Sequence, residues 1–221
     1  MKTRSSKSKK FDWTLWWKWV VGSALGLVFG YIIGPLAGLS IGYVVASVAG
    51  QNAGALVAFI VVGAVIGAAI SLAQGLLLRN EMGKLKRWVL MSSLGWAAGH
   101  GAVALIGALP IDALASDALG RAATGALFGL AQWVVLRQSM PQASWWVWAN
   151  IVGWLIGPFL AGFLIAPLTQ GPGESVVIFL VPALTGALGA VLTGLLMERF
   201  VRQSLEAELI KSGPPDRTGR R

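Results

Sequence analysis

Residues 88–99 read WVLMSSLGWAAG, and this stretch decides the fold because its pattern returns twice. The pattern is Trp, six residues, Gly, then Leu or Trp, two residues and Gly, and it recurs at 19–30 (WVVGSALGLVFG) and 146–157 (WVWANIVGWLIG). No gap is needed to align the copies. Similarity at a fixed spacing is typical of an internal repeat, so the sequence predicts three copies of one structural unit.

A second pattern closes each unit. It is a Gly-Ala pair with Gln or Thr seven residues after the glycine, and it begins at Gly67, Gly125 and Gly186. Each unit therefore holds two apolar segments that can pair as a helical hairpin. We predict hairpin repeats at 13–80, 81–138 and 139–199.

The composition argues against a soluble protein. Of the 221 residues, 56% are hydrophobic and only 12% are charged, and the mean hydropathy is +0.70, whereas about a quarter of residues are charged in a soluble domain. Stretches long enough to cross a hydrocarbon core of about 30 Å occur at 15–33, 53–78, 88–109, 118–136, 145–166 and 176–197. We therefore predict an all-α, polytopic membrane protein with six transmembrane helices.

The basic residues predict the orientation. Lys and Arg gather in the N-terminal segment, in the second and fourth connectors and after the last span, while the first connector is uncharged. The positive-inside rule then places both termini in the cytoplasm. We expect a bacterial inner membrane, with a thylakoid membrane as the alternative. Topology explains the net charge of +9, so anionic lipid headgroups, and not nucleic acid, are the expected partner.

The remaining segments follow from length and composition. Residues 36–48 are apolar but cover only about half a crossing, so 35–50 is interpreted as a re-entrant or helix-extending segment on the outer face, entered through a break at Gly34-Pro35. The other expected segments are a disordered basic tail at 1–12, a cytoplasmic helix extension at 200–212 and a disordered tail at 213–221.

The repeated glycines predict how the helices pack. Each unit crosses twice, so all copies enter the membrane in the same direction and would be related by a pseudo-threefold axis along its normal. Small residues on one face let lipid-embedded helices approach closely. The expected packing residues are Gly26, Gly30, Gly67, Gly95, Gly99, Gly125, Gly129, Gly153, Gly157 and Gly186.

One polar residue on each helix falls at a common depth, about 6 to 8 Å inside the cytoplasmic boundary by helical rise. The set is Ser23, Ser92, Asn150, Gln74, Gln132 and Thr193. Two interpretations are open. Each Ser or Asn can pair with a neighbouring Gln or Thr as a helix clamp, or all six can converge on the axis as a polar constriction or ligand cradle.

The tryptophans and the single histidine suggest fewer sites. Most of the 11 Trp, including Trp19, Trp88 and Trp146, fall near the cytoplasmic boundary, where indole rings anchor helices at headgroup level. His100 lies between two glycines and is a candidate axial ligand for a porphyrin-type pigment, although an isolated buried His is more often only hydrogen-bonded.

We find no catalytic constellation and no metal site in the sequence. Cysteine is absent and the single His has few carboxylates to join it. The acidic residues of the third connector have no nucleophile and base beside them. We therefore expect a protein that is not an enzyme.

The stretch Gly125, Gly129, Gln132, Trp133, Leu136 and Arg137, followed by Trp145-Trp146 and Gly153-Trp154, resembles a group of uncharacterised multi-pass bacterial membrane proteins, many of them cyanobacterial. The resemblance covers roughly 88–199. The first and third copies depart from it at Gly75 and Thr193. It implies a multi-pass fold and leaves the activity open.

The sequence therefore supports two hypotheses for function. The first is a scaffold, an assembly partner or a binder of lipid or pigment that acts through helix packing, with other membrane subunits or a second copy as partners. The second is a small-solute channel or facilitator with a polar constriction near the cytoplasmic side.

Overall fold

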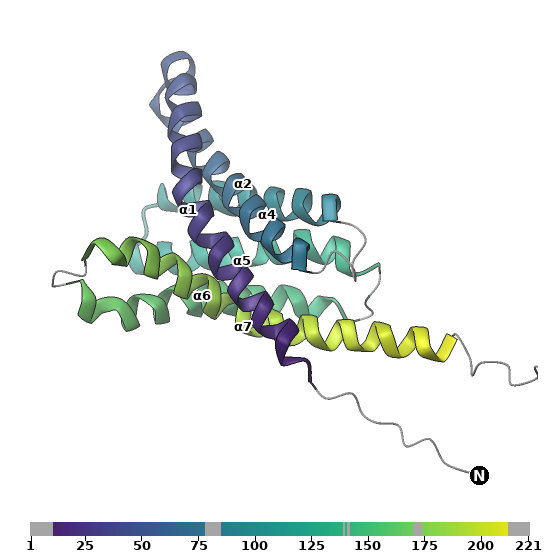
Figure 1. Ribbon diagram of the computed structural model, residues 1–221. Helices are drawn as coiled ribbons and strands as arrows, with labels where there is room; N and C mark the ends of the chain where they lie inside the picture. The colour runs from purple at the N-terminus through teal and green to yellow at the C-terminus, as the bar shows by residue number, and fades with distance from the viewer. Residues whose placement is uncertain (1–10, 78–84, 139, 141, 170–173, 212–221) are drawn as a thin grey trace, which may run out of the picture.

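The computed structural model describes residues 11–77, 85–138, 140, 142–169 and 174–211. Within these ranges every regular element is helical and no strand occurs. The long helices are α1 (Trp13–Ala49), α2 (Gln51–Leu77), α4 (Leu85–Gly107), α5 (Ala113–Leu136), α6 (Ser144–Ile165) and α7 (Glu174–Lys211), and a single 3-10 turn, η1, covers Ala166–Leu168 (Figure 1). These six helices are long and apolar enough to cross a membrane, as predicted.

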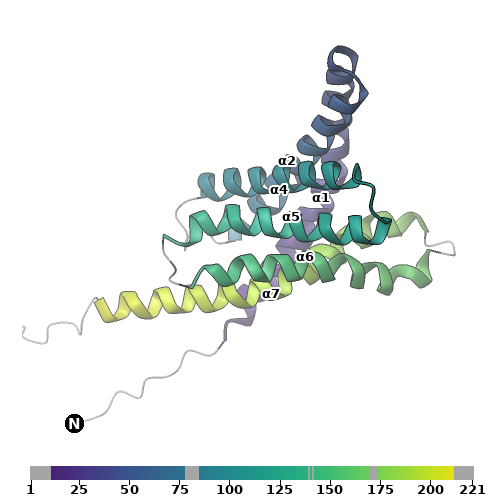
Figure 2. The same ribbon diagram turned by 180° about the vertical axis from the view of Figure 1, so that it is seen from behind.

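The helices form a closed ring. Each packs against the helix before it and the helix after it, and α7 packs against α1 to close the circle. We call the end where α1 begins the terminal end, and the opposite end the far end. Seen from behind, α4, α5 and α6 run side by side, while α7 passes beyond them at the terminal end (Figure 2).

The first helix is longer than a crossing requires. α1 has 37 residues and continues through Pro35 to Ala49, which gives a length of about 55 Å by helical rise. The expected break at Gly34-Pro35 is absent, so residues 35–49 extend the first helix. At the far end α1 and α2 lean away together from the other four helices (Figures 1 and 2).

The last helix is also extended. α7 continues through the segment expected at 200–212 as far as Lys211. Of the expected tails, residues 1–10 and 213–221 lie outside the described residues.

The outer surface of the ring is strongly apolar. Large hydrophobic side chains such as Leu114, Phe159 and Phe163 are 78%, 71% and 72% exposed. Apolar patches of this kind are rare on soluble monomers, and a bilayer would cover them.

Candidate functional site

Glycines bring the helices of each hairpin close together near the terminal end. A Cβ atom added to these glycines would lie 2.6 Å from Ile70 Cα at Gly26, 2.9 Å from Phe128 Cα at Gly95 and 2.9 Å from Gly189 O at Gly153. Real Cβ contacts are essentially never this short. Any side chain at these positions would therefore push the paired backbones apart.

A second set of glycines joins one hairpin to the next. An added Cβ would lie 2.9 Å from Ser93 Cα at Gly67, 2.8 Å from Ile151 Cα at Gly125 and 3.0 Å from Ala24 Cα at Gly186. The three partner residues each follow a repeated tryptophan by five positions.

The other expected packing glycines also face a neighbouring helix. An added Cβ would lie 2.8 Å from Ile66 Cα at Gly30, 2.9 Å from Thr124 Cα at Gly99, 3.0 Å from Val147 Cα at Gly129 and 3.3 Å from Gly189 N at Gly157.

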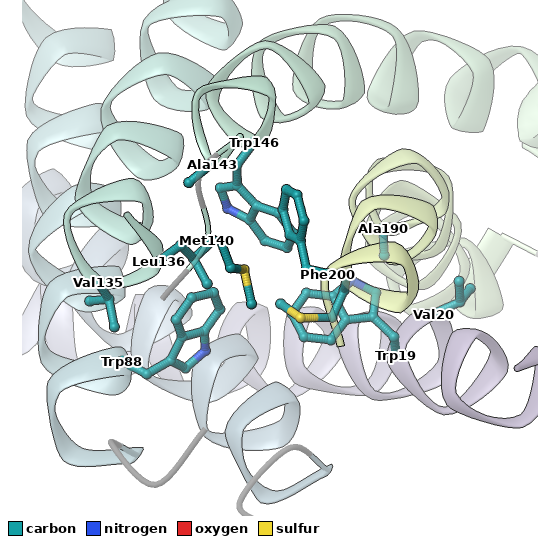
Figure 3. Close-up of a cluster of buried hydrophobic side chains, with 11 residues drawn as sticks. Trp19, Val20, Trp88, Val135, Leu136, Met140, Ala143, Trp146, Ala190 and Phe200 are labelled. Atoms are coloured by element: carbon teal, nitrogen blue, oxygen red, sulfur yellow. The ribbon is translucent and has the colours of Figure 1, made fainter. Parts of the chain in front are cut away.

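The three repeated tryptophans meet in the middle of the ring (Figure 3). Trp19, Trp88 and Trp146 are 1%, 1% and 0% exposed, and their ring centroids lie 5.7 to 6.3 Å apart in edge-to-face pairs. Met140 and Phe200 belong to the same hydrophobic cluster. We call these three rings the tryptophan layer, and it closes the terminal end.

Headgroup anchoring, expected for most tryptophans, is therefore wrong for these three. Each shares a helix face with the packing glycines, so the close approach of the helices turns its indole inward. Trp13, Trp17 and Trp145 do remain exposed, at 61%, 57% and 62%.

Two of the three indoles donate hydrogen bonds to the polar residues expected at one depth. Trp146 Nε1 donates to Gln132 Oε1 at 2.8 Å, and Trp19 Nε1 donates to Thr193 Oγ1 at 3.2 Å. Among the described residues, Trp88 Nε1 and Gln74 Oε1 are buried without a hydrogen-bond partner. Two of the three indoles in the tryptophan layer are thus hydrogen-bonded to residues of the polar set.

The expected helix clamps form in two hairpins. Gln74 Nε2 donates to Ser23 Oγ at 2.9 Å, and Gln132 Nε2 donates to Ser92 Oγ at 3.0 Å. In the third hairpin the corresponding residues bond within their own helices instead: Asn150 Nδ2 donates to Trp146 O and Thr193 Oγ1 to Ala190 O.

The polar residues also surround a small cavity of about 20 Å³. Its lining includes Ser23, Gln74, Gln132, Asn150 and Thr193, each no more than 4% exposed. Ser92, the sixth member of the set, is held by Gln132. A cavity of this size and polarity has room for one water molecule. Two of the expected clamps therefore form, and five of the six polar residues also border one cavity.

A second group of aromatic rings lies on the far side of this cavity. Trp96 and Trp154 meet edge to face with centroids 4.6 Å apart, and Phe128 lies 5.5 Å from Trp96. Trp154 lines the small cavity and also the space beyond it. Phe128 lines only the small cavity and Trp96 only the space beyond, so Trp154 is the ring that borders both.

The space beyond is a wide cavity of about 1680 Å³, which we call the far-end cavity. Residues of all six long helices line it, and most of them are apolar. His100, Asp117 and Arg121 are also on its wall. Arg121 Nε donates to Asp117 Oδ2 at 2.6 Å, and His100 Nδ1 lies 3.2 Å from Trp96 O.

Sequence reasoning missed this cavity. A signal was available in Pro35, Pro158 and Pro182, since all three lie inside long helices and all three line the cavity. Proline disturbs the regular helix, and irregular backbone at membrane depth is tolerated where it lines a cavity or is buried in protein.

The described residues contain no group of three or more His, Asp or Glu that could hold a metal ion. No protein-family model, no curated protein and no solved structure matches the chain.

Proposed function

We propose that the chain is an integral membrane protein that binds a lipid or similar amphipathic molecule in the far-end cavity. The observation that carries this proposal is the cavity itself, an open space of about 1680 Å³ that is bordered by residues of all six helices. Small-molecule pockets usually measure roughly 300 to 1,000 Å³ and are mainly apolar. This cavity is larger, as a molecule with long acyl chains requires.

The membrane setting supports the same ligand class. The leaning far ends of α1 and α2 form one side of the cavity, through Leu39 and Phe59 among others. With the orientation that the charge pattern predicts, the terminal end faces the cytoplasm and the cavity belongs to the outer half of the bilayer. A lipid from that leaflet can enter without crossing the membrane.

The threefold repeat is part of the proposal. Its support is the mutual contact of Trp19, Trp88 and Trp146, together with the glycine contacts, which link each hairpin to the next through equivalent positions. In this architecture the terminal half is a closely packed base, and the far half forms the binding site.

The test is a cavity-filling substitution. Ala104 lines the cavity, so Ala104→Trp should displace bound lipid. Leu130→Trp is the matched control, because Leu130 is 45% exposed on the outer surface. Native mass spectrometry of the full chain, purified in mild detergent, should show lipid retained by the wild type and by the control, and lost from Ala104→Trp. Equal retention by all three proteins would contradict the proposal.

A channel or facilitator is the second candidate. It is favoured by the small cavity that Gln74 and Gln132 help to line, which shares Trp154 with the far-end cavity and has Trp146 of the tryptophan layer in its wall. Solute flux would require the tryptophan layer to open. The chain has no native cysteine, so Gln74→Cys and Gln132→Cys can be probed directly with aqueous thiol reagents, with exposed Asn52→Cys as the positive control. Labelling of the two buried positions would favour the channel, and their protection would favour the binder.

Two other roles stay predictions. An assembly scaffold would retain other subunits after mild purification. A porphyrin-type pigment on His100 would give a visible absorbance that His100→Ala removes.

A further inference from the structure

Two charged side chains lie on the wall of the far-end cavity. Asp117 and Arg121 are the only Asp, Glu, Lys or Arg residues among the described residues that line it. Both belong to α5, which is long and apolar enough to cross a membrane. Ionisable residues within membrane helices are costly, and those that occur usually pair with one another and mark the path of a substrate. The pair therefore points to a ligand with a charged group.

The pair keeps most of its hydrogen-bonding capacity. Arg121 Nε donates to Asp117 Oδ2 at 2.6 Å, and no other hydrogen bond of either side chain is found among the described residues. A guanidinium has further N–H donors besides Nε, and a carboxylate has a second oxygen. The side chains of Arg121 and Asp117 are 36% and 56% exposed. A ligand in the cavity can therefore reach both.

The two charges are opposite and adjacent, and this selects the charge of the ligand. A purely anionic group that accepts from Arg121 also comes close to the Asp117 carboxylate. A purely cationic group that binds Asp117 comes close to the guanidinium in the same way. Each meets one attraction and one repulsion, and both forces are strong at an apolar wall, where charges are poorly screened. A group that carries a negative and a positive charge side by side satisfies both residues.

The position of the pair suits a headgroup at the far end of the cavity. Asp117 and Arg121 lie four and eight residues after the first residue of α5, which is about 6 and 12 Å along the helix by helical rise. Trp154 lines the cavity where it meets the small cavity. A headgroup at the pair would leave its acyl chains against apolar side chains such as Val62 and Trp154.

We infer that the ligand is a zwitterionic phospholipid, whose phosphate accepts hydrogen bonds from Arg121 and whose ammonium group donates to Asp117. The planar guanidinium matches the geometry of a phosphate group, and hydrogen bonds between ionised partners are the strong ones. Because it names the ligand of the far-end cavity, this assignment rests on the proposed function.

Two phospholipids with equal acyl chains test the assignment. Phosphatidylethanolamine carries a phosphate and an ammonium group, whereas phosphatidylglycerol carries only the negative charge. An equimolar mixture is added to the delipidated full chain in mild detergent, and native mass spectrometry identifies the lipid that stays bound. Lipid that Ala104→Trp displaces is counted as cavity lipid, because Ala104 lines the cavity. The wild type should retain phosphatidylethanolamine about tenfold over phosphatidylglycerol, which corresponds to about 1.4 kcal/mol.

Each member of the pair has its own expected effect. Asp117→Asn leaves a positive wall, so the preference should reverse in favour of phosphatidylglycerol, and a reversal cannot result from loss of folding. Arg121→Gln removes the phosphate contact, so the retention of both lipids should fall several-fold. Arg137→Gln is the matched control, because Arg137 stacks on Trp133 and does not line the cavity. Its preference should equal that of the wild type.

A soluble headgroup separates a lipid site from a site for small zwitterions. Glycerophosphoethanolamine carries the same two charges without acyl chains. At the concentration of the lipid it should displace none of the bound phosphatidylethanolamine. Displacement would show that acyl chains are not needed for binding and would contradict a lipid ligand.

The remaining outcomes separate the two proposals. If Ala104→Trp displaces no lipid, the proposed function fails. If it displaces lipid but the wild type retains phosphatidylglycerol at least as strongly as phosphatidylethanolamine, lipid binding stands and the zwitterionic headgroup is wrong. The same conclusion follows if Asp117→Asn keeps the preference of the wild type.

Discussion

The two halves of this helical ring are built from the same six helices, yet their centres differ, because one is filled by packed side chains and the other is a cavity. At the terminal end, glycines bring backbones into contact and three indoles fill the centre. At the far end, α1 and α2 lean away and a cavity of about 1680 Å³ separates the helices.

Small residues hold these helices together in both halves, because an added Cβ would also clash across the α1–α2 pair at Gly38, Gly42 and Gly54 in the far half, while prolines lie on three of the helices that border the cavity. A bilayer offers no hydrophobic drive for helices to associate, so close van der Waals contact and interhelical hydrogen bonds must supply it. The terminal half has both. The far half has proline on three helices, which weakens regular packing where a cavity is formed.

The largest effect should come from adding a methyl group to a closed contact. In Gly26→Ala the new Cβ would lie 2.6 Å from Ile70 Cα, and relieving that clash should cost about 2 to 3 kcal/mol. Gly162→Ala, at a far-half helical position with no atom within 4 Å, should be neutral or slightly stabilising. Unfolding titrations in mixed micelles measure both. Equal losses of stability in the two variants would mean that the helix contact at Gly26 is no closer than the surroundings of Gly162.

A smaller difference in stability is expected between variants at two members of the tryptophan layer. Trp146→Phe removes the donor to Gln132 Oε1 and leaves that buried oxygen unpaired. Trp88→Phe removes an N–H that has no partner among the described residues. Because the volume change is the same, the first variant should be less stable by about 1 to 2 kcal/mol. Thermal unfolding of the two variants side by side checks this, and the reverse order would contradict the hydrogen-bond assignment.

A helix clamp should contribute less to stability than the hydrogen bond of Trp146. Ser92→Ala removes the acceptor for Gln132 Nε2 and should cost about 0.6 kcal/mol, the average for polar contacts between membrane helices. Ser93→Ala is the control, since the Ser93 hydroxyl donates only to Val89 O of its own helix. A double-mutant cycle between Ser92 and Gln132 isolates the pair, and a coupling energy of zero would show that no clamp exists.

The smallest effect is expected at the ion pair on the far-end wall. The side chains of Asp117 and Arg121 are 56% and 36% exposed, so Asp117→Asn should lower stability by about 0.3 to 0.5 kcal/mol at low salt. High salt should shrink the difference further. A loss above that of Ser92→Ala would place this pair in a drier environment than its exposure indicates.

Much of this architecture could be predicted from the sequence, because the main signals are local. The length of the apolar stretches predicted the six helices. The equal spacing of the repeated pattern predicted that Ser23, Gln74 and Gln132 face neighbouring helices. The orientation of Trp19, Trp88 and Trp146 could not be read in the same way. An indole near a membrane boundary can face a headgroup or the ring centre, and only the closeness of neighbouring helices decides between them.

The shape of the far-end cavity could not be predicted for a related reason, although three prolines marked the helices that line it. It depends on the angle between helices, which arises from many contacts at once and has no periodic pattern. The Gly34-Pro35 pair was interpreted as a break, yet α1 continues through it. A membrane helix tolerates an interior proline when neighbouring groups satisfy the freed carbonyl.

The hydrogen bond between Trp19 and Thr193 joins residues 174 positions apart, and this separation bears on biosynthesis. The ribosome releases the first hairpin long before the last helix exists. Until then the indole N–H of Trp19 lacks its acceptor, Thr193 Oγ1. An insertase or chaperone that covers this seam during translation would spare the nascent chain an exposed polar edge, and the arrival of the final helix would displace it.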